Sequence, residues 1–368
     1  MIPHNLPDYV ERGGRQVWRP PYTARKAKLL GFVLGADRAA IDALLHRDLV
    51  EPARGAVDYR CAHDRIAVIF ASIERLASGD ARDRLRGYLS EFEVSVWCLA
   101  ADVSAGSRLV WYLPYVFVDS GQASASGREV YGYPKQIGIF DAGFHSAVES
   151  GGTTTVAALS IDPYTPDTKA VPRPMIAAEQ KPGGEQVVAS GTDAFTSRLF
   201  TLFADQDPVE VDETLPFGPG PQPTGAITPI GSPPPPPAAP AAVPAWAATR
   251  VLDTLLGRGL VAAPDELIGE MALNPTLVFL KQFRDATCPT KACYQAIVEA
   301  PLSVDPVTAS YNELDPGRFE VTLEDYPSHP IASELGLQGG SALPPEAAFR
   351  ATLDFDIELG LEVWRAPT

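Results

Sequence analysis

Apolar and polar residues alternate over several short stretches of the chain, as they do in half-buried β-strands. In residues 92–100, for example, two valines and Cys98 fall on one face, while Glu93, Ser95 and Trp97 fall on the other. Similar alternation, or a run of apolar, β-branched and aromatic residues, is found at residues 65–73, 109–118, 153–161, 276–283, 292–303, 318–323 and 349–363. The sequence predicts a strand at each of these positions.

Helical spacing is rarer, and it predicts helices at residues 38–45, 194–204 and 246–256. The densest proline cluster lies at residues 214–246 and includes an unbroken proline run at 233–237. Proline fixes φ and removes a backbone donor, so this cluster can form neither a strand ladder nor a helix interior. We interpret it as an extended linker, with a partner-binding polyproline segment as the alternative.

Predicted strands lie on both sides of the proline-rich segment, which favours one β-rich α+β domain with a long insertion over two independent domains. Composition is compatible with a sizeable core, because 45% of the 368 residues are hydrophobic and 21% are charged. The formal net charge is −16, which argues against nucleic acid or an anionic membrane as the main partner. The sequence shows neither a secretory signal nor an apolar run long enough to span a membrane, so we expect a cytoplasmic protein.

The usual signatures of several enzyme classes are missing from the sequence. The five histidines show no metal-ligand spacing, and neither a serine-hydrolase elbow nor a phosphate-binding glycine loop occurs. Four cysteines are few for this length. Cys288 and Cys293 do not have zinc-site spacing, and the sequence leaves open whether they are bridged or free.

The segment GREVYGYPK, residues 127–135, stands out among the remaining candidates. It follows a predicted strand and a stretch of small residues, 120–127, that is too polar and flexible for a strand. Pro134 disfavours the α region for Tyr133 and can open a helical turn, so we expect Lys135 in a first helical turn. On residue physics alone, Lys135 is predicted to be a surface lysine after a turn, because lysine is rarely buried.

This segment resembles the Schiff-base lysine motif of the acetoacetate decarboxylase family. Weaker similarities in the same order are found at residues 19–22, 87–91, 274–281 and 294–295, so the resemblance covers roughly residues 15–160 and 270–365. It implies one domain over residues 1–368, with a large, mainly antiparallel, barrel-like sheet and a few helices. Residues 162–270, which contain the proline-rich linker at 214–246, are then an insertion.

The resemblance also implies a chemistry that uses no metal or organic cofactor. Lys135 forms an imine with a small keto acid, and the imine accepts the electron pair released by decarboxylation. Only the neutral amine is nucleophilic, so the pKa of this lysine must be lowered from about 10.4. The family has a second lysine next to the first, and this chain has Gln136 instead, so we expect burial to do most of the lowering.

Glu91 matches the family's glutamate and is expected to position substrate or move protons, with a solvated charge at a strand start as the alternative. Arg128, Glu129, Tyr133 and Gln136 are expected to bind substrate or support the site, with Arg128 and Glu129 holding the loop. A further acidic position of the family falls near Phe70 and Ala71, and a substrate-side arginine near Ala27, so neither has a counterpart here.

Three hypotheses follow for function. The first is a decarboxylating lyase of the acetoacetate decarboxylase type, and the second is a Schiff-base aldolase, dehydratase or cyclase acting on a pyruvate-type substrate. The third is a relative that binds a ligand without catalysis. Members of the family commonly assemble, so the resemblance also implies a homo-oligomer.

Overall fold

The computed structural model describes residues 6–11, 17–105, 108–192 and 274–367, together with residues 194, 198 and 202. The predicted helix at 246–256 and the proline-rich cluster at 214–246 lie outside the described residues, and so does most of the helix predicted at 194–204. None of the helices in the described part is long and apolar enough to cross a membrane. Cys288 and Cys293 are both free and exposed.

Strands are the main regular elements of the described chain. The first group of elements is β1 (Tyr22–Gly35), α1 (Arg38–Leu45), η1 (His46–Val50), β2 (Tyr59–Ser78), β3 (Leu89–Asp102), η2 (Val103–Ala105), β4 (Arg108–Val118), α2 (Gly121–Ser126), η3 (Gly127–Tyr131), β5 (Lys135–Ile137), β6 (Ile139–Phe140) and α3 (Phe144–Ser150). The second group is β7 (Thr154–Ser160), β8 (Val171–Gln180), β9 (Val187–Ser190), β10 (Thr276–Arg284), β11 (Ala292–Val304), β12 (Ser310–Leu314), η4 (Pro316–Arg318), β13 (Phe319–Leu323), η5 (Ser333–Leu335), β14 (Ala342–Leu343), β15 (Ala347–Ile357) and β16 (Leu361–Arg365).

The predicted strands all have counterparts, and the helix predicted at 38–45 is α1. One prediction was wrong in detail, because residues 349–363 form two strands, β15 and β16. The chain leaves β15 at Ile357, and the Glu358 N–H donates to the carbonyl of Pro301 at 2.9 Å. Both strands then pair with β11. β15 pairs with the last residues of β11, and β16 pairs with the middle of β11. A single straight strand could not make both pairings.

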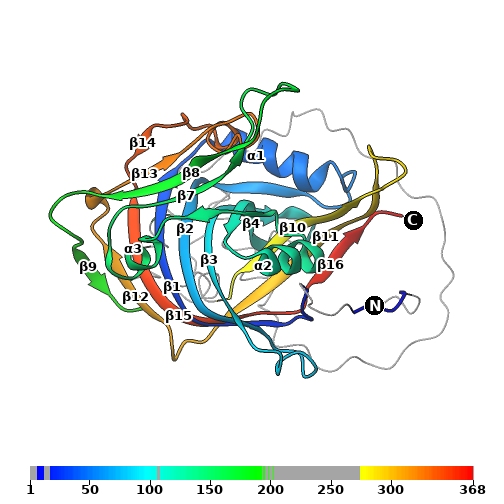
Figure 1. Cartoon of the computed structure of the whole chain (residues 1–368), viewed down its shortest axis with the longest axis horizontal. Coiled ribbons are helices and arrows are strands. Elements are labelled where there is room, and N and C mark those ends of the chain that lie inside the picture. The colour runs from blue at the N-terminus through cyan, green and yellow to red at the C-terminus, as the bar shows by residue number, and fades with distance from the viewer. Residues whose placement is uncertain are drawn as a thin grey trace.

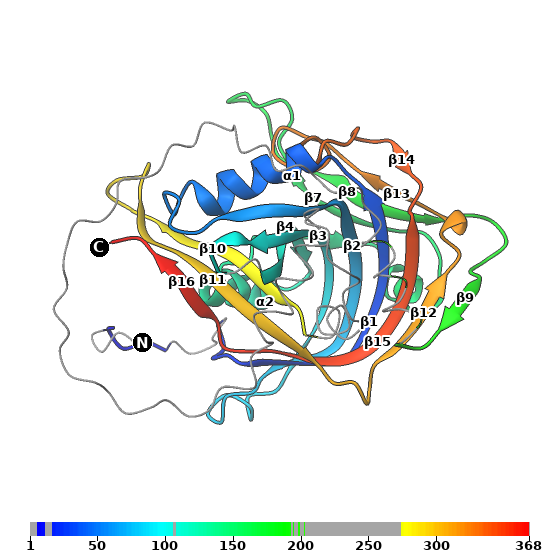
Figure 2. The same ribbon diagram turned by 180° about the vertical axis from the view of Figure 1, so that it is seen from behind.

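The large sheet closes on itself as a barrel. Its strands pair in the order β11, β10, β4, β3, β2, β1 and β15, and an additional β11–β15 pairing completes the ring (Figure 2). The pairings are antiparallel except for β10 with β4, and the short strand β5, which adds to β4, is also parallel. The mainly antiparallel, barrel-like sheet predicted from the resemblance is therefore confirmed.

A second sheet, in the order β14, β13, β8, β7 and β6, covers one side of the barrel with α1 nearby (Figure 1). The main core lies between the two sheets. In β2, the side chains of Ile66, Val68 and Phe70 face this core, while the residues between them face the inside of the barrel. One face of the barrel wall therefore packs in the core between the sheets and the other lines the inside of the barrel. For this reason, alternation alone does not show which face of a strand meets solvent.

The strands that were not predicted are the short β5, β6 and β14 and the longer β1, β8, β9 and β12. β8 and β9 fall within residues 162–270, the expected insertion, yet β8 pairs with β7 and β13, and β9 pairs with β12. Residues 171–190 are therefore part of the two sheets. An insertion in the remaining part of this range stays a proposal.

Candidate active site

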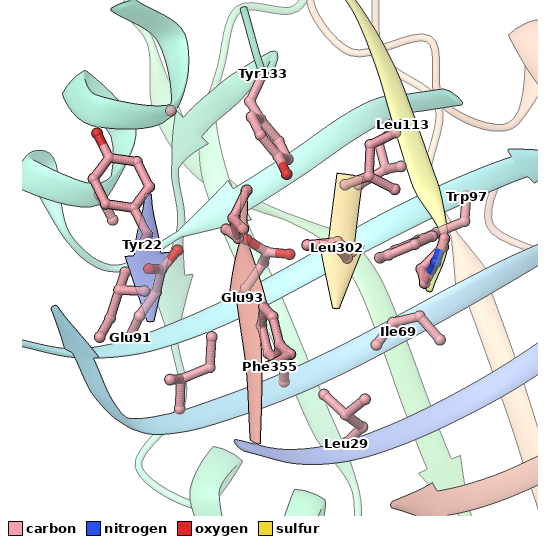
Figure 3. Close-up of a pocket in the computed structure, with 18 of the residues that line it drawn as sticks. Tyr22, Leu29, Ile69, Glu91, Glu93, Trp97, Leu113, Tyr133, Leu302 and Phe355 are labelled. Carbon is pink, nitrogen blue, oxygen red and sulfur yellow. The ribbon is translucent and has the colours of Figure 1, made fainter. Parts of the chain in front are cut away.

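The inside of the barrel holds a cavity of about 220 Å³ (Figure 3). Its wall is formed mostly by apolar side chains from opposite sides of the ring. They include Leu29, Val33, Ile69, Ile73, Leu76, Leu89, Leu113, Leu277, Leu302, Phe349, Leu353, Phe355 and Ile357. Polar groups come mainly from β3, with Glu91 and Glu93, and from the chain around the motif segment, with Ser126 just before it and Lys135 at its end.

The motif segment is a helical turn followed by a reversal. Ser120 caps α2 by accepting from the backbone N–H of Ala123 at 3.2 Å, and α2 runs into the π-helical turn η3. Gly132 ends this turn with φ of 91°, a left-handed conformation that glycine adopts without steric cost. The chain then enters β5 at Lys135, which pairs with Val116 of β4.

Lys135 therefore lies in a strand, and the prediction of a first helical turn was wrong. The ladder with β4 holds the residue extended. Gly127 leaves room for the Lys135 side chain to pass the helical turn, because a Cβ at position 127 would lie 2.9 Å from Lys135 Cδ. The surface-lysine alternative was also wrong, since Lys135 is only 8% exposed.

The amine of Lys135 meets two carboxylates on β3. Its Nζ lies 2.7 Å from Glu91 Oε1 and 3.2 Å from Glu93 Oε2. Nζ is also 5.5 Å from the centre of the Tyr133 ring. Glu91 is 1% exposed, so its alternative as a solvated charge was wrong. Its second oxygen, Oε2, is buried without a hydrogen-bond partner among the described residues.

The electrostatics differ from the expectation that burial lowers the lysine pKa. Burial acts in that direction, but the carboxylates of Glu91 and Glu93 outweigh it and raise the pKa of Lys135 above its ordinary value. Burial raises the pKa of Glu91 to about 7, Lys135 opposes this rise and Glu93 adds to it. The resting amine is therefore an ammonium ion, and the proton that is easiest to add or remove near neutral pH belongs to Glu91.

No protein-family model matches the sequence, and no curated protein matches it. Among solved structures, acetoacetate decarboxylase from Legionella pneumophila superposes with a TM-score of 0.52 at 10% identity, over 98% of this chain and 94% of that one. The chain has the acetoacetate decarboxylase-like fold. Another structure of acetoacetate decarboxylase gives a TM-score of 0.50 at 10% identity, over 96% and 94% of the two chains. The enduracididine biosynthesis enzyme MppR complexed with pyruvate gives 0.49 at 14% identity, over 96% and 93%.

Within this acetoacetate decarboxylase-like fold, three of the predicted supporting residues lie outside the cavity wall. The guanidinium of Arg128 donates to the carbonyl of Lys135 at 3.1 Å and so ties η3 to β5. Glu129 is half-buried beside it. Gln136 follows Lys135 in β5, and successive residues of a strand point to opposite faces. The Gln136 side chain therefore points away from the cavity, and its Oε1 lies 2.8 Å from His329 Nε2. Of this group, only Tyr133 lines the cavity.

Glu93 is the site residue that sequence reasoning missed. It lies directly opposite Ala71 in the β2–β3 register, next to the position where the resemblance expected an acidic residue. Its spacing of two residues from Glu91 was the available signal, since such residues share a strand face. No arginine replaces the one expected near Ala27, because Lys135 is the only Lys, Arg or His among the described residues that line the cavity.

Proposed function

We propose that this protein is an acetoacetate decarboxylase-like lyase in which Lys135 forms a Schiff base with a keto substrate. The first candidate reaction is decarboxylation of a keto acid. The observation that carries this proposal is the placement of Lys135 Nζ, buried at an apolar cavity and 2.7 Å from a carboxylate that can take its proton. Membership of the family is part of the proposal, because structural likeness at 10% identity supports the fold alone.

The first chemical step is proton transfer within the pair. An ammonium ion cannot attack a carbonyl, so Nζ gives a proton to Glu91. Because burial raises the pKa of Glu91 to about 7, this transfer is easier than it would be to an ordinary carboxylate. Oε2 of Glu91, which has no hydrogen-bond partner in the described part of the chain, can then hydrogen-bond to the substrate oxygen.

Imine formation and carbon–carbon cleavage follow from that state. The neutral amine attacks the carbonyl carbon and gives a carbinolamine. Glu91 returns its proton to the oxygen, water leaves, and a protonated imine remains beside the two carboxylates. In a 3-oxo acid the bond to the carboxylate then breaks, its electron pair moves into the imine to give an enamine, and carbon dioxide leaves. A proton added to carbon restores the imine, and water hydrolyses it to the ketone and free Lys135.

A second candidate is aldol-type condensation or dehydration through the same imine. One observation favours it, namely that the described residues place two carboxylates and a single cation at the site. Glu91 and Glu93 can move protons at carbon and oxygen, while the described residues of the wall include no arginine to hold a substrate carboxylate. Release of carbon dioxide distinguishes the two reactions.

Borohydride trapping tests the shared step. The full chain is incubated with acetoacetate, with pyruvate and with a wider panel of keto compounds, reduced, and mapped by mass spectrometry. We expect a reduced adduct on Lys135, and no adduct in a Lys135→Arg variant, which keeps the charge and lacks the nucleophile.

Lys281 provides a matched control, because it is a nearby lysine on β10 whose pKa burial lowers, and it does not line the cavity. Lys281→Arg should still be trapped at Lys135. An adduct on Lys281 in place of Lys135, or full activity of Lys135→Arg, would contradict both enzyme proposals. No adduct with any keto compound would leave the ligand-binding relative as the better description.

A further inference from the structure

We infer that the substrate of the Lys135 site carries a long, uncharged apolar tail, aliphatic or aromatic, behind its carbonyl group. This inference rests on the Schiff-base function proposed above and adds the substrate class to it. It differs from the small keto acid expected from the sequence. Three features of the cavity carry it: its length, its lining and the position of its charges.

The cavity is much longer than a four-carbon substrate. Strand β2 lines it with every second residue from Ala67 to Ile73, and a strand rises about 3.3 Å per residue, so this wall is about 20 Å long. The volume of about 220 Å³ also exceeds what a small acid fills. A cavity of about 150 Å³ is enough to bind benzene, which has about as many non-hydrogen atoms as acetoacetate.

The charges lie at one end of this space. Glu91 pairs with Ile73 and Glu93 with Ala71 in the β2–β3 register, whereas Trp97 pairs with Ala67 at the other end of the same wall. In Figure 3, Glu91 lies beside Tyr22 at one side of the view, and Trp97 lies at the other. When the carbonyl group of a substrate is held at Lys135, the cavity therefore leaves room for the rest of the substrate to extend toward Trp97.

The end around Trp97 is apolar. The Trp97 and Trp111 rings meet edge to face with centroids 5.9 Å apart, and Val33 and Leu113 complete this part of the wall. Among the described lining residues, Lys135, Glu91 and Glu93 are the only Asp, Glu, Lys, Arg or His side chains. A charged group at the tip of the tail would be desolvated without a partner, which is strongly unfavourable. An apolar tail would gain from the same surroundings.

A homologous series of 2-ketones from acetone to 2-undecanone tests the tail. For each ketone, the concentration that gives half-maximal borohydride trapping on Lys135 is measured. We expect this concentration to fall by up to about fourfold per methylene until the cavity is full, the factor that follows from burying one CH₂ group. A ketone of equal length with a carboxylate at the tail tip should lose most of that gain. Trapping that is independent of tail length, or strongest with acetone, acetoacetate or pyruvate, would overturn the inference while leaving the Schiff base intact.

Two variants at the tail end change the available length in opposite directions. Ala67→Leu should move the optimum to shorter ketones, and Trp97→Ala to longer ones. Val307→Leu is the surface control, because Val307 is 90% exposed and does not line the cavity, and it should leave the optimum unchanged. An optimum that stays fixed in both cavity variants would also count against the inference.

Calorimetric binding of the same ketones without borohydride separates failure of the tail inference from failure of the proposed function. If no ketone is trapped but affinity still rises with tail length, the tail inference stands and the Schiff-base proposal fails. If affinity is flat along the series, the tail inference fails, whatever the trapping result.

Discussion

Lys135, Glu91 and Glu93 form a group in which one ammonium faces two carboxylates inside an apolar cavity. Such a group titrates as a unit, and its protons are shared between the members. The reactive arrangement is the neutral amine beside protonated Glu91, which contains the same number of protons as the ammonium–carboxylate pair. A further proton on Glu91 removes the carboxylate nearest to the ammonium as a proton acceptor, and this happens as the pH falls through about 7.

The pH dependence of imine formation should therefore rise with pH and level off above an apparent pKa of about 7, where Glu91 becomes a carboxylate that can accept the lysine proton. It should not require the alkaline pH of free lysine, because the proton passes directly to Glu91. In Glu91→Gln this limb should disappear, and the rate should fall by about 10²- to 10⁴-fold, the usual contribution of a positioned acid–base group. The measurement is the rate of borohydride trapping from pH 5 to 9.

Glu299→Gln provides the control for this experiment. Glu299 is also a buried carboxylate, paired with Arg108, but it does not line the cavity. The variant should keep the limb near pH 7. If the limb persists in Glu91→Gln or vanishes in Glu299→Gln, Glu91 is not the proton acceptor.

The sequence could name part of this group but not its electrostatics. Lys135 and Glu91 were predicted from the motif and its order along the chain, and both line the cavity. Glu93 was assigned to the polar face of a strand, which is correct, but that face lines a cavity and not solvent. Alternation tells which residues share a face and not what the face meets, so neither the second carboxylate nor the raised pKa of Lys135 could be predicted.

At the scale of elements, strands with regular alternation were predictable and irregular ones were not. β1 carries Arg25, Lys26 and Lys28, and its pairing with β15 shifts register between Ala24 and Ala27, which breaks the period of two. β8 has prolines at its second and fourth residues, and proline normally marks a non-strand or an edge. Both strands depend on pairing with neighbours that the local sequence does not reveal.

The turn between η3 and β5 gives a test at this scale. At Gly132, with φ of 91°, an added Cβ would lie 2.6 Å from the Lys281 Cα and 2.7 Å from its N. Gly132→Ala must therefore strain the turn and push against the backbone of β10. We expect it to lower the free energy of unfolding by about 2–5 kcal/mol, the sum of left-handed strain and overpacking, and to slow trapping on Lys135.

Gly55→Ala is a control that separates the effect of left-handed strain from the effect of overpacking. Gly55 has φ of 75°, but an added Cβ there would meet nothing within 4 Å. It should cost only about 1–2 kcal/mol in urea unfolding and leave trapping unchanged. Equal losses for the two variants would mean that contact with Lys281 does not determine the position of the turn.

At the scale of the whole molecule, the site depends on pairings between distant parts of the chain. The ring closes through β4 with β10 and through β11 with β15, and the residues between β9 and β10 separate its halves in sequence. These closures could not be predicted from local patterns, because a strand's periodicity does not name its partner. The barrel was predicted from the resemblance to the family, because that resemblance rests on the order of segments on both sides of the proline-rich region.

The barrel wall has two buried faces, an outer one that packs against the second sheet and an inner one that lines the cavity. Substitution of one phenylalanine on each face tests whether the two faces have different roles. Phe319 of β13 packs outside the barrel against Phe32 of β1, with ring centroids 5.2 Å apart, while Phe349 of β15 lines the cavity. Phe319→Ala should lower the free energy of unfolding by about 3–5 kcal/mol, because it leaves a void between the sheets. It should not change the ketone length that Lys135 prefers. Phe349→Ala widens the cavity instead, so it should shift that preference.

Urea unfolding and the trapping series together check this division. A changed length preference in Phe319→Ala would mean that the second sheet shapes the cavity through the wall. An unchanged preference in Phe349→Ala would mean that the tail does not reach β15. The expected pattern, stability from the outer face and specificity from the inner face, would explain how substrate preference in this fold can vary while the packing between the sheets is kept.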